Sequence, residues 1–278
     1  MVGFLQLKKN NKFLNTFVYS NTLISLGAFL LCLQTYLLNN LNVNLYYCIF
    51  VFTSTFVSYN IQRLFRAKEI QKYNPNSWFI SRKKVVWTFV ILNLLISIFS
   101  LYFFISLPLL IWLIPVGVIS FLYSFNGLRN IPYLKIFFIS ISWGITCGVI
   151  PFVLSSETNF SLIFINFSLV FLYIFSITIP FDIRDKSLDE DNKKTIPQII
   201  GIEKAKKIAN ITLLIYLLLS VYFFPIYTLP FLLSCISAFA LIRFSFEKNQ
   251  DLYFSFWIDG HILFQFFVIF LIFFSNLF

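Results

Sequence analysis

The stretch FSLIFINFSLVFLYIFSITIPFDIRDKSLDE, residues 160–190, places a long apolar run directly before a cluster of acidic residues. The apolar part, residues 160–181, is long enough for a helix that crosses a membrane, which needs about 20 such residues. Three aspartates follow it: Asp182, Asp185 and Asp189. On a helix these positions are spaced i, i+3 and i+7 and therefore share one face. The sequence thus predicts carboxylates gathered at the end of a membrane span.

This acidic cluster has the chemistry of a metal site. Mg²⁺ is usually held by one or two carboxylates together with the phosphates of a substrate. We therefore predict Asp182, Asp185 and Asp189 to be magnesium ligands and catalytic residues, with a lipid diphosphate as substrate. A simpler alternative stays open, in which the segment is a solvated loop whose acids balance Arg184 and Lys186.

The composition of the whole chain indicates an integral membrane protein. Its 278 residues are 59% hydrophobic and only 12% charged, whereas soluble domains carry about 25% charged residues. The apolar runs predict an all-α fold, a single domain over residues 1–278 with nine transmembrane helices. The predicted spans are residues 16–38, 44–62, 85–105, 108–125, 133–153, 160–181, 208–224, 226–243 and 255–277.

The basic residues predict how these spans are oriented. All 21 Lys and Arg residues fall on the side that carries the N-terminus, and the loops of the opposite side contain Glu157 as their only charge. By the positive-inside rule, the N-terminus is cytoplasmic and the C-terminus lies outside. The two longest predicted loops, residues 63–84 and 182–207, are both cytoplasmic and rich in charge. We expect the active site between them, at the cytoplasmic face of the cell (inner) membrane.

The net charge and the cysteines limit the kinds of partner. This topology and an affinity for anionic lipid head groups explain the net charge of +10. Membrane lipid is therefore an expected partner and nucleic acid is not. Cys32, Cys48, Cys147 and Cys235 all fall in predicted spans without a C-x-x-C pair. They are expected to be buried apolar residues rather than metal ligands or disulfides.

Two motifs and the layout of the spans resemble one known family. The aspartate cluster is followed by Thr195-Ile196-Pro197 and Gly201, as in that family's second aspartate motif. Leu122-Tyr123-Ser124, with Arg129 and Lys135 after it, is similar to the family's Tyr-Ser…Lys-Arg loop between the fourth and fifth spans. With the nine-span layout, these motifs resemble the UbiA superfamily of intramembrane prenyltransferases.

The resemblance implies a function and a set of site residues. It implies an enzyme that moves an isoprenoid chain from a prenyl diphosphate to a small acceptor, with Mg²⁺ as cofactor and the tail lying between helices, open to the bilayer. The acceptor is left open. Tyr123, Ser124, Arg129 and Lys135 are the predicted substrate-binding residues of the Tyr-Ser loop. A simpler role in capping the span stays open for Tyr123 and Ser124.

The family's first aspartate motif is altered in this chain. In the family, an Asn at the end of the second span is followed, four and eight residues later, by Asp residues that hold Mg²⁺. Asn60 matches the Asn, but Leu64 and Lys68 stand at the two Asp positions. Leu cannot ligate a metal ion and Lys repels one. We therefore expect Arg63, Arg66 and Lys68, with Asn60 beside them, to contact the phosphates in place of a second metal ion.

Other roles remain open for this region. Basic residues at a helix end also anchor a protein at the membrane surface, and Asn60 is equally suited to a helix–helix hydrogen bond. The altered motif also supports a second hypothesis, a non-catalytic lipid-binding or scaffold protein of the same fold. A transporter ranks last, because Gly144, Gly148 and Pro151 interrupt the fifth span without an accompanying charge.

Two ionisable residues lie inside the ninth predicted span. Asp259 and His261 are costly to place in a membrane, and such groups suggest function by default. Because they are two residues apart, they do not share a helix face. A structural pair between Asp259 and Arg243, or another cytoplasmic base, is an equally good explanation.

Overall fold

The structure, a computed structural model, describes residues 12–65, 67, 78–124, 134–186 and 194–275. The side chains of Lys12, Tyr123 and Ser124 lie outside this description. The described chain is helical, which confirms the predicted fold class. Its first half forms α1 (Lys12–Tyr19), α2 (Thr22–Leu38), α3 (Leu45–Phe65), α5 (Trp78–Ser81), α6 (Lys83–Tyr102), α7 (Leu107–Ser124) and α8 (Leu134–Trp143).

The second half of the chain continues the bundle. A π-helical turn, Gly144–Val149, joins α8 to a short following helix, and a second one, Tyr253–Ile258, precedes the last helix. The remaining helices are α9 (Ile150–Leu154), α10 (Phe160–Asp185), α11 (Ile196–Ile200), α12 (Ile202–Phe223), α13 (Thr228–Arg243) and α14 (Asp259–Ser275), with a 3₁₀ turn at Pro225–Tyr227.

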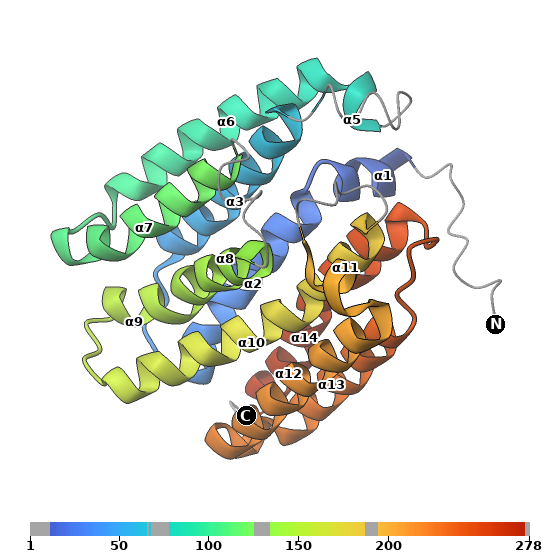
Figure 1. Ribbon diagram of the computed structural model, residues 1–278. Coiled ribbons are helices and arrows are strands. Elements are labelled where there is room, and N and C mark those ends of the chain that lie inside the picture. The colour runs from blue at the N-terminus through green and yellow to red at the C-terminus, as the bar shows by residue number, and fades with distance from the viewer. Residues whose placement is uncertain (1–11, 66, 68–77, 125–133, 187–193, 276–278) are drawn as a thin grey trace.

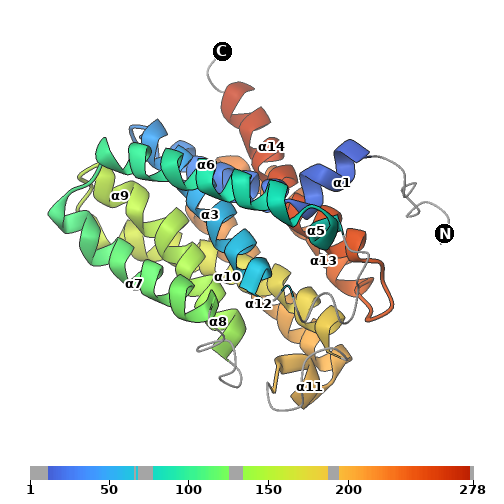
Figure 2. The ribbon, with the colours of Figure 1, turned by 90° about the horizontal axis from the view of Figure 1, so that it is seen from above.

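The long helices run side by side in one bundle. Figure 1 shows α6 and α7 along one edge and α12 and α13 along the opposite edge, with α2 and α10 between them. The most extensive packing joins α3 to α6, α10 to α12, and α2 to both α3 and α14. In both ribbon views the short helices α1, α5 and α11 lie at the same end of the bundle, where α3 and α10 also end (Figures 1 and 2).

Several helices have the length and apolarity of membrane spans. Six meet both criteria: Lys83–Tyr102, Leu134–Leu154, Phe160–Asp185, Ile202–Phe223, Pro225–Arg243 and Tyr253–Ser275. A seventh is added if α1 and α2, which are bent by 62° relative to each other, count as one span. Helices also occupy the predicted spans 44–62 and 108–125, as α3 and α7. The number of nine spans and the orientation of the two termini stay predictions.

The bend in the first predicted span has a local cause. Asn21, between α1 and α2, has a φ of 64°, in the left-handed region that Asn tolerates better than most residues. Its side chain donates a hydrogen bond to Asn60 of α3 at 3.1 Å. The bend is therefore tied to the end of the next long helix.

The predicted loop 182–207 is more helical than expected. Helix α10 continues to Asp185 instead of ending at residue 181, and α12 begins at Ile202 instead of 208. The Thr195 amide donates to Gln198 Oε1 at 2.8 Å at the start of α11, and Gly201 then turns the chain with a φ of +84°. These turns bring α11 and the start of α12 close to the end of α10.

The interior of the bundle is apolar with scattered polar groups. Its largest fully buried side chains include Tyr36, Tyr47, Tyr173, Phe152 and Phe231. All four cysteines are free and buried, as the sequence predicted. A smaller separate cluster packs the end of α3 against α5 and α6 and contains Phe56, Val57, Leu64, Phe79, Val86 and Val90.

Candidate active site

The end of α10 carries a buried ion pair. Lys135 Nζ, in the first turn of α8, lies 2.5 Å from Asp182 Oδ1 in the last turns of α10. The side chains of Lys135 and Asp182 are 11% and 2% exposed. Charges this deeply buried are tolerated because they are paired. The two residues belong to different predicted motifs, and the folded chain brings them together.

Asp185 is held by its own neighbour. Arg184 Nε and Nη2 donate to the two Asp185 carboxylate oxygens at 2.7 and 3.2 Å, a two-point contact typical of Arg–carboxylate pairs. The Arg184 guanidinium also lies 5.3 and 5.5 Å from the ring centres of Phe181 and Phe254. These rings come from α10 and from the π-helical turn before α14. Arg184 is therefore fixed between two parts of the bundle.

Asn60 lies at a helix–helix contact. Its side chain is fully buried, and its Nδ2 donates to the carbonyl oxygens of Ser20 and Phe56, both at 2.9 Å. Its Oδ1 accepts the hydrogen bond from Asn21. This arrangement corresponds to the helix–helix role that the sequence left open, and a direct role of Asn60 in ligand binding stays a proposal.

Arg63 is turned toward the interior of the bundle. Its Nη1 donates to the Tyr19 carbonyl oxygen, at the end of α1, over 2.8 Å. The guanidinium lies within electrostatic reach of Arg184, Asp251 and Asp259. A basic residue that only anchors a helix end would extend toward the head groups. Arg63 instead connects the end of α3 to the end of α1.

The altered first motif has a structural explanation at one position. Leu64 is 7% exposed and belongs to the apolar cluster with Phe79 of α5 and Val86 and Val90 of α6. Its side chain therefore contributes to a hydrophobic contact, consistent with the inability of Leu to ligate a metal ion. The other altered position, Lys68, lies outside the described residues, as do Arg66, Arg129 and Asp189 and the side chains of Tyr123 and Ser124.

The two ionisable residues near the start of α14 face different surroundings, as their spacing predicted. His261 Nδ1 lies 2.7 Å from the Tyr173 hydroxyl, and its Nε2 lies 2.9 Å from Ser237 Oγ, inside the core. Asp259 lies instead within electrostatic reach of Arg63 and Arg184. Arg243, the partner considered from the sequence, is exposed at the end of α13.

A large cavity lies along α3 and α8, the helices that carry Arg63 and Lys135. It measures about 660 Å³ and lies mainly between α3, α6, α7 and α8. Ligand pockets in proteins commonly measure about 300–1,000 Å³ and have mostly apolar walls. Among the residues that line this one are Phe50, Trp87, Leu113, Phe121, Phe138 and Trp143.

The position of Lys135 relates the ion pair to this cavity. Lys135, Ile139 and Ser142 are spaced i, i+4 and i+7 on α8 and share one face, and the last two line the cavity. The cavity also has a polar stripe on α3, formed by Ser54, Ser58 and Gln62. The sequence analysis missed this stripe, although its four-residue spacing inside an apolar run could have revealed it.

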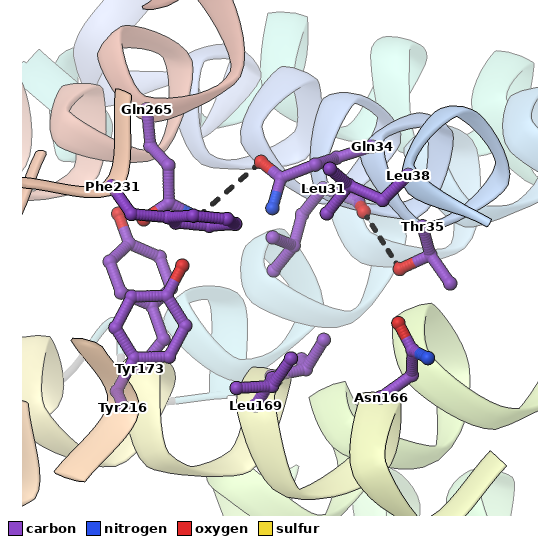
Figure 3. A pocket seen from close by; sticks show the side chains of 11 residues that line it. Leu31, Gln34, Thr35, Leu38, Asn166, Leu169, Tyr173, Tyr216, Phe231 and Gln265 are labelled. Carbon is purple, nitrogen blue, oxygen red and sulfur yellow. Dashed lines mark hydrogen bonds between the residues drawn. The ribbon is translucent and has the colours of Figure 1, made fainter. Parts of the chain in front are cut away.

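A second cavity is too small for a substrate. It measures about 20 Å³, which is room for roughly one water molecule, and lies between α2, α10, α12, α13 and α14. Figure 3 shows Gln265 and Gln34 facing each other across it, with the Gln265 amide donating to Gln34 Oε1 at 3.4 Å. Tyr173 and Tyr216 lie beside this pair (Figure 3). These residues join the two halves of the bundle.

The described residues offer donors for one magnesium ion. Asp182 and Asp185 supply the hard oxygen atoms that Mg²⁺ prefers, three residues apart at the end of one helix. No group of three or more potential metal-binding side chains is found within the described ranges. In addition, each of the two carboxylates is already paired with a cationic side chain. A magnesium ion would share these carboxylates with Lys135 and Arg184 or replace one of these side chains, and it would take its remaining ligands from phosphate.

The sequence was also compared with known protein families. The model of the UbiA prenyltransferase family matches residues 79–256, which is more than half of the chain. The matched region includes the end of α10 and begins after the altered first motif. No curated protein matches the chain in sequence.

Solved structures of similar fold include UbiA homologues. A UbiA homologue from Aeropyrum pernix K1, in its apo form, matches with a TM-score of 0.66 and 13% identity over 93% of this chain and 98% of its own. A UbiA homologue from Archaeoglobus fulgidus, bound to GPP and Mg²⁺, matches with a TM-score of 0.63 and 12% identity over 91% and 98%. A digeranylgeranylglyceryl phosphate synthase matches with a TM-score of 0.58 and 15% identity over 92% and 96%. At these identities, the likeness concerns the fold.

Proposed function

Because the chain belongs to the UbiA prenyltransferase family, we propose that it is an enzyme that transfers an isoprenoid chain from a prenyl diphosphate to a small acceptor. The observation that carries this proposal is the position of Lys135, the partner of Asp182, on the face of α8 whose later residues Ile139 and Ser142 line the cavity of about 660 Å³. A charged end and a long apolar space match the two halves of a prenyl diphosphate. The solved homologue with GPP and Mg²⁺ binds a ligand of this kind.

The residues around the diphosphate would stabilise its charge. When the bond between the allylic carbon and the diphosphate oxygen breaks, its electron pair stays on the diphosphate. Lys135 and Arg63, with Arg66, Lys68 and Arg129 from outside the described residues, would stabilise that charge electrostatically. A magnesium ion held by Asp182, Asp185 and Asp189 would add positive charge to the leaving group. Asn60 would hold Arg63 in place through the contact between α3 and the α1–α2 bend.

The cavity would hold the isoprenoid chain while it is cationic. Tyr59, Trp87 and Trp143 line the cavity, and aromatic faces attract a nearby cation by about 0.5–2 kcal/mol each. The acceptor then forms a bond to the allylic carbon and loses a proton. Ser58 and Gln62 on the polar stripe could hydrogen-bond to the acceptor beside the tail.

A non-catalytic lipid-binding protein of the same fold is the second candidate. It is favoured by the apolar role of Leu64 and by the pairing of Asp182 and Asp185 with cationic side chains. Such a protein would bind a prenyl diphosphate without breaking it. The two candidates therefore differ in whether diphosphate is released.

The experiment measures diphosphate release by the purified protein in detergent. Farnesyl and geranylgeranyl diphosphate would be supplied with Mg²⁺ or EDTA, with a panel of aromatic and alcohol acceptors. We expect release that requires Mg²⁺ and that is lost in the Asp185→Asn, Asp189→Asn double variant. Glu203→Gln, which changes an exposed acid on α12, is the matched control and should behave like the wild type. Undiminished transfer by a folded double variant would contradict the assignment, and tight binding without release would favour the second candidate.

A further inference from the structure

We propose that the acceptor of the prenyl group is an electrically neutral molecule with hydroxyl or carbonyl groups, bound between two polar stripes of the large cavity. The inference rests on the proposed function and names the chemical class of its second substrate. One stripe is the one already described on α3. The other is formed by Ser142 of α8 and Thr146 of the π-helical turn Gly144–Val149, and it adds these two residues to the site.

The walls of the cavity of about 660 Å³ differ in polarity. Among the described residues, those that α6 and α7 contribute are apolar or aromatic, except for Ser120. The walls from α3 and α8 instead carry hydroxyl and amide groups at four-residue spacing, which places them on one face of each helix. These residues are Ser54, Ser58 and Gln62 on α3, and Ser142 and Thr146 on α8 and the turn after it. The cavity therefore has an apolar side for the isoprenoid tail and a polar side for another molecule.

Four of the polar side chains have unused hydrogen-bonding groups. A hydroxyl inside a helix often donates to a carbonyl oxygen of the preceding turn, as those of Ser54 and Ser140 do at 3.3 and 2.9 Å. Within the described part of the chain, no hydrogen bond is formed by the side chains of Ser58, Gln62, Ser142 and Thr146. Polar groups among apolar walls are costly to leave unpaired. A ligand with matching donors and acceptors would satisfy all four.

The π-helical turn Gly144–Val149 fixes the second stripe in place. The buried Tyr47 hydroxyl of α3 donates to the Thr146 carbonyl oxygen at 2.7 Å. On α10, the Asn166 carbonyl oxygen lies so close to Gly148 that a Cβ atom there would be 2.8 Å away. The turn is thus held between α3 and α10, and such turns are frequent at functional sites. The Thr146 hydroxyl is therefore positioned by contacts on both sides.

The cavity favours an uncharged acceptor. None of the described residues that line it is charged. An ionised carboxylate or phosphate without a counter-charge is costly to place among such walls. Arg63 and Lys135 lie at the ends of α3 and α8, where the proposed function places the diphosphate. A neutral acceptor needs no counter-charge and would pair with the unused hydroxyl and amide groups.

The second stripe lies at a suitable distance from the charged end of α8. Ser142 follows Lys135 by seven residues, which is about 10 Å along the helix axis. This separation leaves room for the diphosphate beside Lys135 and for the allylic carbon next to the acceptor. The acceptor and the tail would then lie side by side, each against the wall that matches its polarity.

The test measures equilibrium binding by calorimetry, with the protein in detergent. Inorganic pyrophosphate and Mg²⁺ are present throughout, so that the charged end of the cavity is occupied. The probes are two pairs that differ mainly in charge: 4-hydroxybenzamide with 4-hydroxybenzoate, and hexylglycerol with hexylglycerol phosphate. We expect the neutral member of at least one pair to bind about ten-fold or more tightly than its anion.

Four variants show whether the polar stripes hold the neutral probe. Ser142→Ala and Thr146→Val each remove one hydroxyl and should weaken its binding by about two- to ten-fold. Ser140→Ala is the matched control on α8, because that hydroxyl bonds to its own helix, and it should leave binding unchanged. Gln62→Lys adds a cation to the cavity and should strengthen binding of the anionic probes several-fold, a gain that a misfolded variant cannot give.

Three results would overturn the proposal. They are anionic probes that bind as tightly as the neutral ones, hydroxyl variants that bind the neutral probes as the wild type does, and a wild type that binds none of the probes. Diphosphate release separates this inference from the proposed function. If release is as fast with acidic acceptors as with neutral ones, only the acceptor class is wrong. If the neutral probes bind as expected but no prenyl diphosphate is cleaved, only the assigned reaction is wrong.

Discussion

The ends of α3 and α10 lie at the same end of the bundle but have opposite chemistry. The end of α10 keeps two carboxylates, Asp182 and Asp185, each beside a cation. The described end of α3 has no carboxylate and instead carries Arg63 and the apolar Leu64. One end therefore offers carboxylates that are paired with cations, and the other offers a cation and an apolar side chain. The difference suggests that side-chain cations on α3 supply the positive charge that metal ions would otherwise bring to a diphosphate.

The largest expected effect on stability comes from placing a carboxylate at the end of α3, as at the end of α10. Leu64→Asp restores the family's residue but places a carboxylate in the cluster with Phe79 and Val86. A Leu64→Ala change would lower the free energy of unfolding by about 2–5 kcal/mol. We expect Leu64→Asp to lower it further, because the variant loses the same packing and also buries an unpaired charge. Denaturant unfolding in detergent would measure this. A stable Leu64→Asp variant with stronger Mg²⁺ binding would show that the side chain can turn toward α10.

The next largest effect on stability is expected when the ion pair between Lys135 and Asp182 is broken. Lys135→Met leaves Asp182 buried without this partner, and loss of one member of a buried pair costs about 3–5 kcal/mol. The Lys135→Met, Asp182→Leu double variant should recover most of this stability without recovering prenyl transfer. Unfolding free energies of the two single variants and the double variant form the required cycle. A double variant whose loss of stability equals the sum of the two single losses would mean that the pair contributes little to the fold.

A smaller effect is expected at the contact between α3 and the α1–α2 bend. Asn60→Ala removes the side chain that bonds to Ser20, Asn21 and Phe56, and the unpaired groups should cost about 1–3 kcal/mol. If Asn60 acts by holding Arg63, the variant should also weaken pyrophosphate binding. Asn60→Asp keeps the acceptor oxygen and serves as the matched comparison. Weaker binding at unchanged stability would instead indicate that Asn60 contacts the ligand directly.

The smallest effect on stability concerns the cavity rather than the helix ends. Gly117 of α7 lines the cavity, and a Cβ atom there would meet nothing within 4 Å. Gly117→Leu should leave stability unchanged or raise it by up to about 1 kcal/mol through better helix propensity. It should also lower activity more with geranylgeranyl than with farnesyl diphosphate, because it shortens the apolar space. Gly117→Ala is the control. If Gly117→Leu lowers the activity with both substrates equally, the end of the prenyl tail does not lie beside Gly117.

Much of the architecture followed from local patterns in the sequence. The apolar runs predicted the helices, because a membrane span must be apolar over its whole length and satisfy its own backbone. The boundaries around residues 182–207 were less accurate, since the last turns of α10 and the first turns of α12 are polar. Polar helical turns at a surface look like loops when only hydropathy is considered.

The sequence by itself determined the fold class, the family and the identity of the charged residues near the helix ends. It could not assign their partners. The Lys135–Asp182 pair and the hydrogen bond from Arg63 to Tyr19 each join residues far apart in the chain. Hydropathy and helical spacing describe one helix at a time, whereas these contacts depend on the packing between helices. Only the tertiary structure therefore decided which charges meet and where the cavity lies.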